Sequence, residues 1–329
     1  MPQGHGGSEL ITCQGGYDQA EADMKMLVAM LIGFLEFAAP CHGHGSELEE
    51  SVLARPVVIG ASISAGLSAG KDFSQVLEVM LECDHQPIDS AFSVLFWRDP
   101  VRTGEFQTRF AMEKRATVLI AIDFLFWFGY AARNINGDPL STEEERMELL
   151  DYGLELLGSV SCPIVLGDLP RYQRALGRTV LPARSCSSET LQKLNQRLRS
   201  WAKERGNVIV LPLAEKLEAI SSNEQLIVGG YACPNGMTQR LLLSDRVHPT
   251  LEGLIWISYL LTTEIVAREW VEGAEVGDDL FSVFERLQEG GASRVGATPR
   301  FVARRFEEQA RRPTVFPVNL VRGRLSPHP

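Results

Sequence analysis

The sequence has few cysteines, and no two of them form a CxxC pair. This absence argues against a zinc ribbon or a thioredoxin-type redox site, both of which are built from such pairs. The thiols are either free or buried, or they include a disulfide in the second half of the chain, among Cys162, Cys186 and Cys233. A disulfide would require an oxidising compartment, and both interpretations stay open.

Positive charge is also scarce. The chain has 32 Lys and Arg against 42 Asp and Glu, which gives a net charge of −10. Because affinity for a phosphate backbone needs clustered basic residues, this balance argues against nucleic acid as the main partner. The remaining composition, 45% hydrophobic and 22% charged in 329 residues, is typical of a globular protein with a sizeable core.

No apolar run in the sequence is long enough to span a membrane. A shorter apolar segment does occur near the N-terminus. There, Met24-Lys25-Met26 precedes the run 27–35, and the small residues of 38–41 follow. This order is typical of a signal peptide, although Glu36 interrupts it and a short amphipathic or buried helix is the alternative. We predict a leader and linker over 1–53 and a secreted or periplasmic protein, with a cytoplasmic location as the alternative.

No internal repeat is visible, and the rest of the chain alternates between two patterns. Short apolar runs, expected as buried strands, occupy 55–60, 116–122, 163–166 and 207–211, with a possible strand at 88–97. Helical patterns occupy 64–82, 105–115, 141–157, 188–203 and 250–270. This alternation indicates an α/β protein with a parallel sheet. We predict one such domain over 54–272. The segment 273–329 is expected to be a helical or basic extension, and a solvated tail is its simplest interpretation.

The glycine-rich segment after the first strand fits three motifs poorly. A phosphate-binding loop needs glycine and a hydroxyl where Ala65 and Asp72 stand, and the GxGxxG dinucleotide spacing is absent. The run Gly66–Gly70 matches the GxSxG nucleophile elbow, but its serine, Ser68, falls inside the predicted helix instead of following a strand.

Ser62 is better placed, because it comes two residues after the first strand. A turn there exposes a hydroxyl at the carboxyl edge of the sheet, and the amides of the following helix favour a developing negative charge. The alternative is a helix N-cap, a common role for serine.

Histidine decides between these interpretations. Only His85 and His248 lie inside the predicted domain, and Asp245 precedes His248 by three residues. That spacing lets the carboxylate accept the imidazole N–H, so that the other ring nitrogen can take a proton from a serine. With Ser62, the residues favour a catalytic triad.

At these residues the chain resembles the GDSL or SGNH hydrolases. The first block reads Gly60-Ala61-Ser62, and the last reads Asp245-Arg246-Val247-His248-Pro249 with Gly253 shortly after. The resemblance spans roughly 55–268. It implies a three-layer α/β/α, flavodoxin-like fold with about five parallel strands.

The resemblance also implies a serine esterase, lipase or carbohydrate-ester deacylase with no metal or cofactor. Ser62 would be the nucleophile and one oxyanion donor, His248 the general base and Asp245 its orienting carboxylate.

Three departures concern the family's other blocks. Ala61 stands where the family has aspartate, so a polar support of the turn is lost. The asparagine expected after the central strand is missing, since Asp123 follows that strand and Asn134 is too far along. The second-block glycine has no clear match, and Gly104 is one possibility. Gly104 and Asp123 are thus candidates for the oxyanion or substrate site, although an ionised aspartate cannot donate a hydrogen bond.

Several functions stay open at this point. Ester hydrolysis leads, and an acyltransferase would use the same acyl-enzyme. A weakly active binding module, or an unrelated α/β domain with a coincidental Ser and His, are further alternatives. An aromatic cluster could line an acyl or sugar pocket, although such residues are more often core: Phe96, Trp97, Phe124, Phe126, Trp127, Phe128 and Tyr130.

Overall fold

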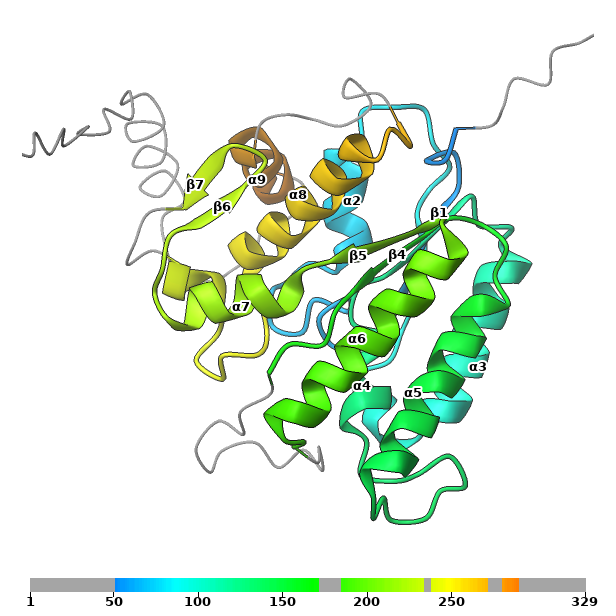
Figure 1. The fold of residues 1–329 in the computed structure, drawn as a ribbon. Helices are drawn as coiled ribbons and strands as arrows, with labels where there is room; N and C mark the ends of the chain where they lie inside the picture. The colour runs from blue at the N-terminus through cyan, green and yellow to red at the C-terminus, as the bar shows by residue number, and fades with distance from the viewer. Residues whose placement is uncertain (1–50, 172–184, 234–237, 272–279, 290–329) are drawn as a thin grey trace, which may run out of the picture. The chain divides into compact units, whose positions relative to one another are not determined.

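The computed structural model describes residues 51–171, 185–233, 238–271 and 280–289 (Figure 1), all within one compact unit, 50–329. The predicted leader over 24–41 and most of the predicted C-terminal extension lie outside the described residues.

A five-stranded parallel sheet forms the centre of this unit. Its strands are β1 (Pro56–Gly60), β2 (Asp89–Phe92), β3 (Val118–Ala121), β4 (Ile164–Gly167) and β5 (Val208–Leu211). Their order is β2-β1-β3-β4-β5, and every neighbouring pair is parallel. All residues of β1, β3 and β4 are buried, as expected when helices cover both faces of a parallel sheet.

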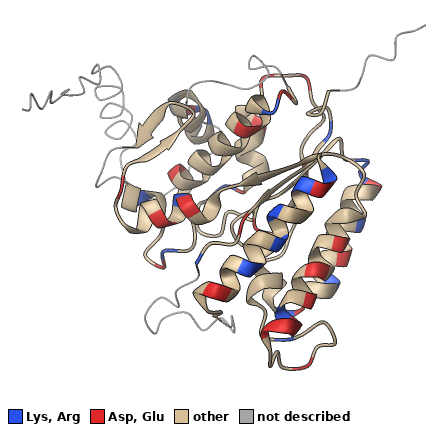
Figure 2. Ribbon diagram, in the orientation of Figure 1, with Lys and Arg blue, Asp and Glu red and all other residues tan. Residues whose placement is uncertain are grey.

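One face of the sheet is covered by four helices: α3 (Pro100–Glu113), α4 (Phe126–Tyr130), α5 (Glu143–Gly158) and α6 (Ser188–Arg205). Val57, Leu119 and Ile164 of the sheet share one hydrophobic cluster with these helices. The short helix η1 (Phe96–Arg98) precedes α3. The exposed charged residues of α5 are acidic, whereas those of α6 are mostly basic (Figure 2).

The opposite face is covered by α2 (Phe73–Met80), α8 (Leu251–Ala267) and α9 (Leu280–Glu289). Between β5 and α8 the chain forms α7 (Leu213–Ser221), a hairpin of β6 (Leu226–Val228) and β7 (Tyr231–Cys233), and η2 (Thr238–Leu241). Val58, Ile120 and Val165 of the sheet belong to the cluster on this face. The three layers confirm the predicted α/β/α fold.

The helix predicted over 64–82 is wrong in its first half. The segment 61–71 is a series of turns, and the helix begins at Phe73. Gly66, Ser68 and Gly70 have φ angles of 59°, 67° and 79°, which a right-handed helix cannot include. Asp72 then caps α2 by accepting a hydrogen bond from the backbone N–H of Gln75.

The aromatic cluster is mainly core. The rings of Phe96, Phe124 and Phe128 are fully buried and lie 5.3 to 5.9 Å apart between centroids, in edge-to-face or tilted contacts. Such contacts stabilise the layer formed by η1, α3 and α4.

Of the two interpretations of the cysteines, free thiols are confirmed and the disulfide is not, because Cys162, Cys186 and Cys233 are unpaired. Cys162 and Cys233 belong to the hydrophobic clusters on opposite faces of the sheet. Burial raises the pKa of both thiols to about 11, which leaves them unreactive at neutral pH.

Among the helices that the structure describes, none combines the length and the apolar character needed to cross a bilayer.

Candidate active site

The site begins in the turn that follows β1, at the carboxyl edge of the sheet. β1 and β3 are neighbours in the middle of the strand order, with β2 on the other side of β1. The order therefore reverses between β1 and β3, and ligands of open α/β sheets bind outside the carboxyl ends of the strands at such a point. Half-buried Ser62 lies there, two residues beyond the end of β1.

The turn that carries Ser62 is held by backbone hydrogen bonds and by one carboxylate. The N–H groups of Ala65 and Leu67 donate to the carbonyls of Ala61 and Ser62, both at 3.0 Å. Asp123, just beyond β3, accepts from the N–H of Ala61 at 2.9 Å, of Ile63 at 2.8 Å and of Ser64 at 3.3 Å. The Ser64 hydroxyl also donates to it, at 2.5 Å.

These four hydrogen bonds change the interpretation of Asp123. Its carboxyl group is buried and accepts from the turn, so it supports the nucleophile loop instead of serving as an oxyanion donor. Burial raises the pKa of Asp123, while the Ser64 hydroxyl and the three N–H groups act in the opposite direction.

Gly60 makes the close approach of this carboxyl group possible. A Cβ atom at residue 60 would lie 2.2 Å from Oδ1 of Asp123, so any other side chain would displace the carboxyl group. On the other side, the Gly60 carbonyl accepts from Nε2 of buried Gln107 at 2.8 Å and from the N–H of Ser93 at 3.1 Å. The end of β1 is thus fixed from both neighbouring strands.

His248 lies beside Ser62, although 186 residues separate them in the sequence. Its Nε2 is 2.9 Å from Oγ of Ser62, and its Nδ1 is 2.6 Å from Oδ2 of Asp245. Because an ionised carboxylate only accepts hydrogen bonds, Nδ1 carries the proton and the Nε2 of the neutral ring accepts from the serine. The structure therefore brings the three predicted residues together.

The turn before α8 positions both the base and its carboxylate. Oδ1 of Asp245 accepts from the N–H groups of Val247 and His248, each at 3.0 Å. The N–H of Leu243 donates to the His248 carbonyl at 2.8 Å, and Thr250 caps α8. Burial acts to raise the pKa of Asp245, but the His248 ring and the two N–H groups together lower it. Asp245 therefore stays ionised and keeps the imidazole in one tautomer.

Among the described residues, one backbone N–H group in the turn has no acceptor. Within the described part of the chain, the N–H of Ser62 has no hydrogen-bond partner, whereas the N–H groups of Ala61, Ile63 and Ser64 all donate to Asp123. Asp123 thus occupies the neighbouring donors and leaves the one at the nucleophile free. A carbonyl oxygen bonded at Ser62 Oγ could accept from it.

The other predicted oxyanion candidate, Gly104, lies elsewhere. It is a buried residue of α3, and a Cβ atom there would lie 2.8 Å from Phe128 and 2.9 Å from Leu156. This glycine allows α3 to pack closely on its neighbours and does not face Ser62. Asn134 is also occupied, since its amide donates to Glu145 at 2.9 Å.

Ser68 and His85 do not join the site. Ser68 is exposed and lies in the turn segment before α2. The ring of His85 bonds the Cys83 carbonyl and the Glu78 carboxylate, at 2.8 and 3.1 Å. Over the described ranges, no group of His, Cys, Asp and Glu side chains is arranged to hold a metal ion.

Asp123 is the site residue whose contribution the sequence reasoning missed. The resemblance placed the supporting carboxylate beside the nucleophile, at residue 61, where this chain has alanine. The signal that could have found it was an aspartate directly after a buried strand, next to the strand that carries Ser62. Here the carboxylate reaches the same turn from β3.

Comparisons with known proteins gave structural similarity only. No protein-family model matches the chain, and no curated protein sequence matches it. Among solved structures, a diltiazem-metabolizing enzyme of a gut microbe is 16% identical with a TM-score of 0.41, and the match covers 63% of this chain and 46% of that one. The chain thus spans less than half of that enzyme's length.

Two other structures are covered almost completely. A GDSL-like lipase from Bacteroides thetaiotaomicron is 13% identical, with a TM-score of 0.42 and coverage of 65% of this chain and 89% of that one. A mutant acetyl-xylooligosaccharide esterase from Geobacillus is 15% identical, with a TM-score of 0.42 and coverage of 67% and 97%. The GDSL family, which the two sequence blocks resemble, thus occurs among these neighbours. At this level of similarity they carry no argument about activity, which has to come from the site itself.

Proposed function

We propose that the protein is a serine ester hydrolase that works through an acyl-enzyme on Ser62. The observation that carries this proposal is the continuous hydrogen-bonded chain from Ser62 Oγ through His248 to Asp245. A helix N-cap at Ser62 would need neither the histidine nor the carboxylate. A pure binding module would also have no use for this arrangement.

In the first half of the reaction, Ser62 Oγ attacks the ester carbonyl carbon while its proton moves to Nε2 of His248. The carbonyl oxygen becomes negative and accepts from the N–H of Ser62. When the tetrahedral intermediate collapses, the bond to the alcohol oxygen breaks and His248 returns the proton to the leaving alcohol. The acyl group remains bonded to Ser62.

In the second half, water takes the place of the alcohol. His248 removes a proton from the water, whose oxygen attacks the acyl carbon, and the bond to Ser62 Oγ then breaks as the serine takes the proton back. Asp245 stays ionised and stabilises the imidazolium in both halves. An acyltransferase would differ only in the acceptor that replaces the water.

The test is hydrolysis of p-nitrophenyl acetate by the purified protein and two serine variants. We expect release of p-nitrophenol by the parent, a fall to background in Ser62→Ala, and parental rates in Ser68→Ala. Ser68 is the matched control because it lies in the same exposed turn segment and belongs to the GxSxG motif. Equal rates in the parent and in Ser62→Ala would reject the proposal.

We also propose that the protein acts outside the cytoplasm, because the segment 24–41 has the order of a signal peptide. The mass of the protein recovered from the culture medium or periplasm would test this. Export predicts a chain that has lost this segment, and an uncleaved chain found only in the cytoplasm would contradict it.

A further inference from the structure

An apolar pocket lies beside the candidate triad, on the side of α7 and α8. Ile63, the residue after the nucleophile, lines this pocket, as do Val247 and Pro249 on either side of His248. The remaining lining comes from α7, β6, η2 and α8. We call this space the α7–α8 pocket; about 530 Å³ of empty space lies in and in front of it, open solvent included.

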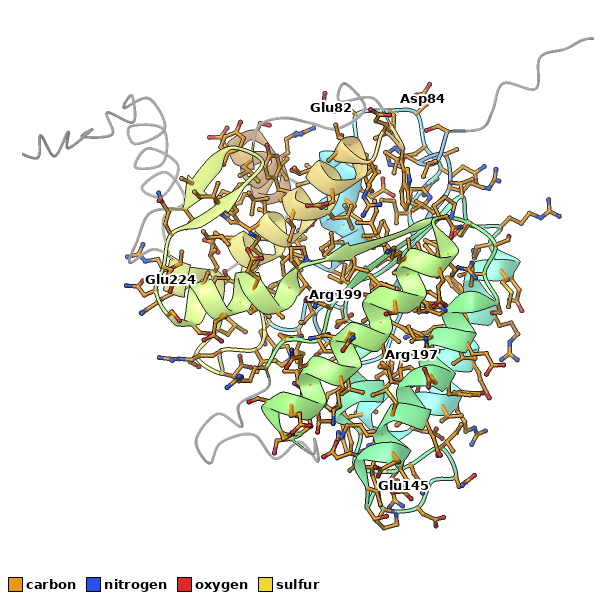
Figure 3. The ribbon with its side chains drawn as sticks, viewed as in Figure 1. Glu82, Asp84, Glu145, Arg197, Arg199 and Glu224 are labelled. Carbon is orange, nitrogen blue, oxygen red and sulfur yellow. The ribbon has the colours of Figure 1, made fainter. Side chains whose placement is uncertain are left out.

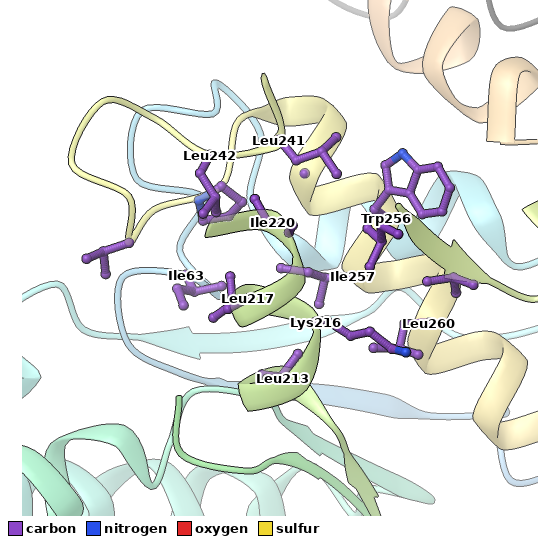
Figure 4. A pocket seen from close by; sticks show the side chains of 15 residues that line it. Ile63, Leu213, Lys216, Leu217, Ile220, Leu241, Leu242, Trp256, Ile257 and Leu260 are labelled. Atoms are coloured by element: carbon purple, nitrogen blue, oxygen red, sulfur yellow. The ribbon is translucent and has the colours of Figure 1, made fainter. Parts of the chain in front are cut away.

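The lining of the α7–α8 pocket is almost entirely hydrophobic. Leu217 and Ile220 of α7 and Trp256 and Ile257 of α8 form much of it (Figure 4). Its one charged residue is Lys216, whose ammonium group pairs with Glu215 at 2.8 Å. Lys216 therefore contributes mainly its apolar stem, and the pocket offers an apolar ligand little competition from bound water.

A second hollow adjoins the pocket and has a different character. It shares Ile63, Leu217 and Val247 with the α7–α8 pocket, but exposed Arg171 and Arg246 also line it. The two spaces therefore meet at the residues that flank Ser62 and His248. An ester bond held at Ser62 would lie between an apolar space and a space whose lining is partly charged.

The surface around the nucleophile turn is also apolar. Val94 and Leu95 are each 47% exposed, and Leu67 is 41% exposed. Ser93 donates to Gly60, and Leu67 donates to the Ser62 carbonyl, so these exposed side chains belong to segments bonded to the nucleophile turn.

We propose that the α7–α8 pocket binds the apolar acyl chain of the ester, while the alcohol leaves through the polar hollow. This inference rests on the proposed function, and it names the substrate class as esters of unbranched aliphatic acids longer than acetate. The acyl group is the part that stays bonded to Ser62 between the two halves of the reaction, and an aliphatic chain is better accommodated by the apolar space than by the polar one. The leaving alcohol is polar at its oxygen and suits the polar hollow.

The first measurement is kcat/KM for p-nitrophenyl acetate, butyrate, hexanoate and octanoate. Each methylene group that enters the pocket should raise kcat/KM by up to about fourfold, until the chain reaches the closed end. Ile257→Trp, which fills the pocket from α8, should remove this gain for hexanoate and octanoate and lower kcat/KM for acetate far less. Ile227→Trp is the matched control, because Ile227 is 54% exposed on β6 and does not line the pocket.

The second measurement is independent of turnover. Calorimetric titration of Ser62→Ala with octanoate should show binding, and adding Ile257→Trp to this variant should abolish it. If esters are hydrolysed without a chain-length preference and octanoate does not bind, the pocket proposal is wrong while the proposed function stands. If no ester is hydrolysed but octanoate binds and Ile257→Trp prevents this binding, the proposed function is wrong, while the pocket still binds an aliphatic acid. Equal losses on acetate and octanoate in Ile257→Trp would also overturn the pocket proposal.

Discussion

An aspartate follows β3 and another follows β4, and the two have different roles. Asp123 lies just beyond β3, Asp168 directly follows β4, and both carboxyl groups are buried. Asp168 accepts from Arg199 of α6 at 2.5 Å and from the N–H of Ala214 in α7 at 2.7 Å, and Figure 3 labels Arg199 on α6. Among the described residues Asp123 has no charged partner of this kind, and its four donors all belong to the Ser62 turn.

This difference shows that one aspartate stabilises the fold and the other stabilises the candidate site. Asp168 ties two helices to the end of β4, so it stabilises the packing around the sheet. Asp123 ties the Ser62 turn to β3, so it sets the position of the nucleophile and leaves the Ser62 N–H unoccupied. Strand ends that look alike in the sequence thus differ in the segment that their carboxylates reach.

The largest effect should come from Asp123→Ala. Four donors would lose their acceptor and the turn would shift, and a displacement of about 1 Å at a reacting atom can cost about a hundredfold in rate. We expect kcat per folded molecule to fall about a hundredfold with KM little changed, and Asp123→Asn to restore part of it because the amide keeps one acceptor oxygen. Steady-state kinetics, with circular dichroism to count folded protein, would measure this. Loss of stability at unchanged kcat would contradict it.

Asp168→Asn should give the opposite pattern. Removing the charge weakens the bonds to Arg199 and Ala214, which should lower the free energy of unfolding by about 1–3 kcal/mol. The site residues keep their contacts, so kcat per folded molecule should change by less than about twofold. Urea unfolding and ester hydrolysis on the same preparation would test it. A loss of kcat as large as that of Asp123→Ala would remove the distinction between the two strand ends.

The smallest effect concerns pH, and it compares Asp123 with Asp245. The pKa of Asp123 is raised, so that at pH values between the ordinary aspartate pKa and the raised one the folded state binds more protons at this group than the unfolded chain does. The stability of the parent relative to Asp123→Asn should therefore fall as the pH rises from the ordinary aspartate pKa to the raised one. The pKa of Asp245 is lowered, so the stability of the parent relative to Asp245→Asn should be lost as the pH falls below the ordinary value. Urea unfolding of the three proteins at several pH values would show whether the two slopes have opposite signs.

The sequence predicted the scaffold well because its signals are local. Buried strands such as 116–122 are short apolar runs, and the three-residue spacing of Asp245 and His248 can be seen within one short block. The first helix was misplaced because the positive φ of Ser68, which no sequence pattern requires, delays it to Phe73. The role of Asp123 depends on the pairing of β1 with β3, which a linear pattern does not specify.

The α7–α8 pocket could not be predicted for a related reason. Its lining combines the nucleophile turn, a short hairpin and the last helices, which are distant in sequence. No strand was predicted after residue 211, whereas residues 231–233 form a strand paired with 226–228. The shape of such a pocket is determined by how several short elements pack together, so the sequence of any one element does not predict it.

The central claim, that Ser62 is the nucleophile, is tested most directly by covalent labelling. The protein would be treated with diisopropyl fluorophosphate, digested, and mapped by mass spectrometry. We expect one adduct on Ser62, no adduct on the buried neighbour Ser64, and no labelling of that peptide in Ser62→Ala. An unmodified Ser62, or an adduct on another residue at the same rate in Ser62→Ala, would contradict the account.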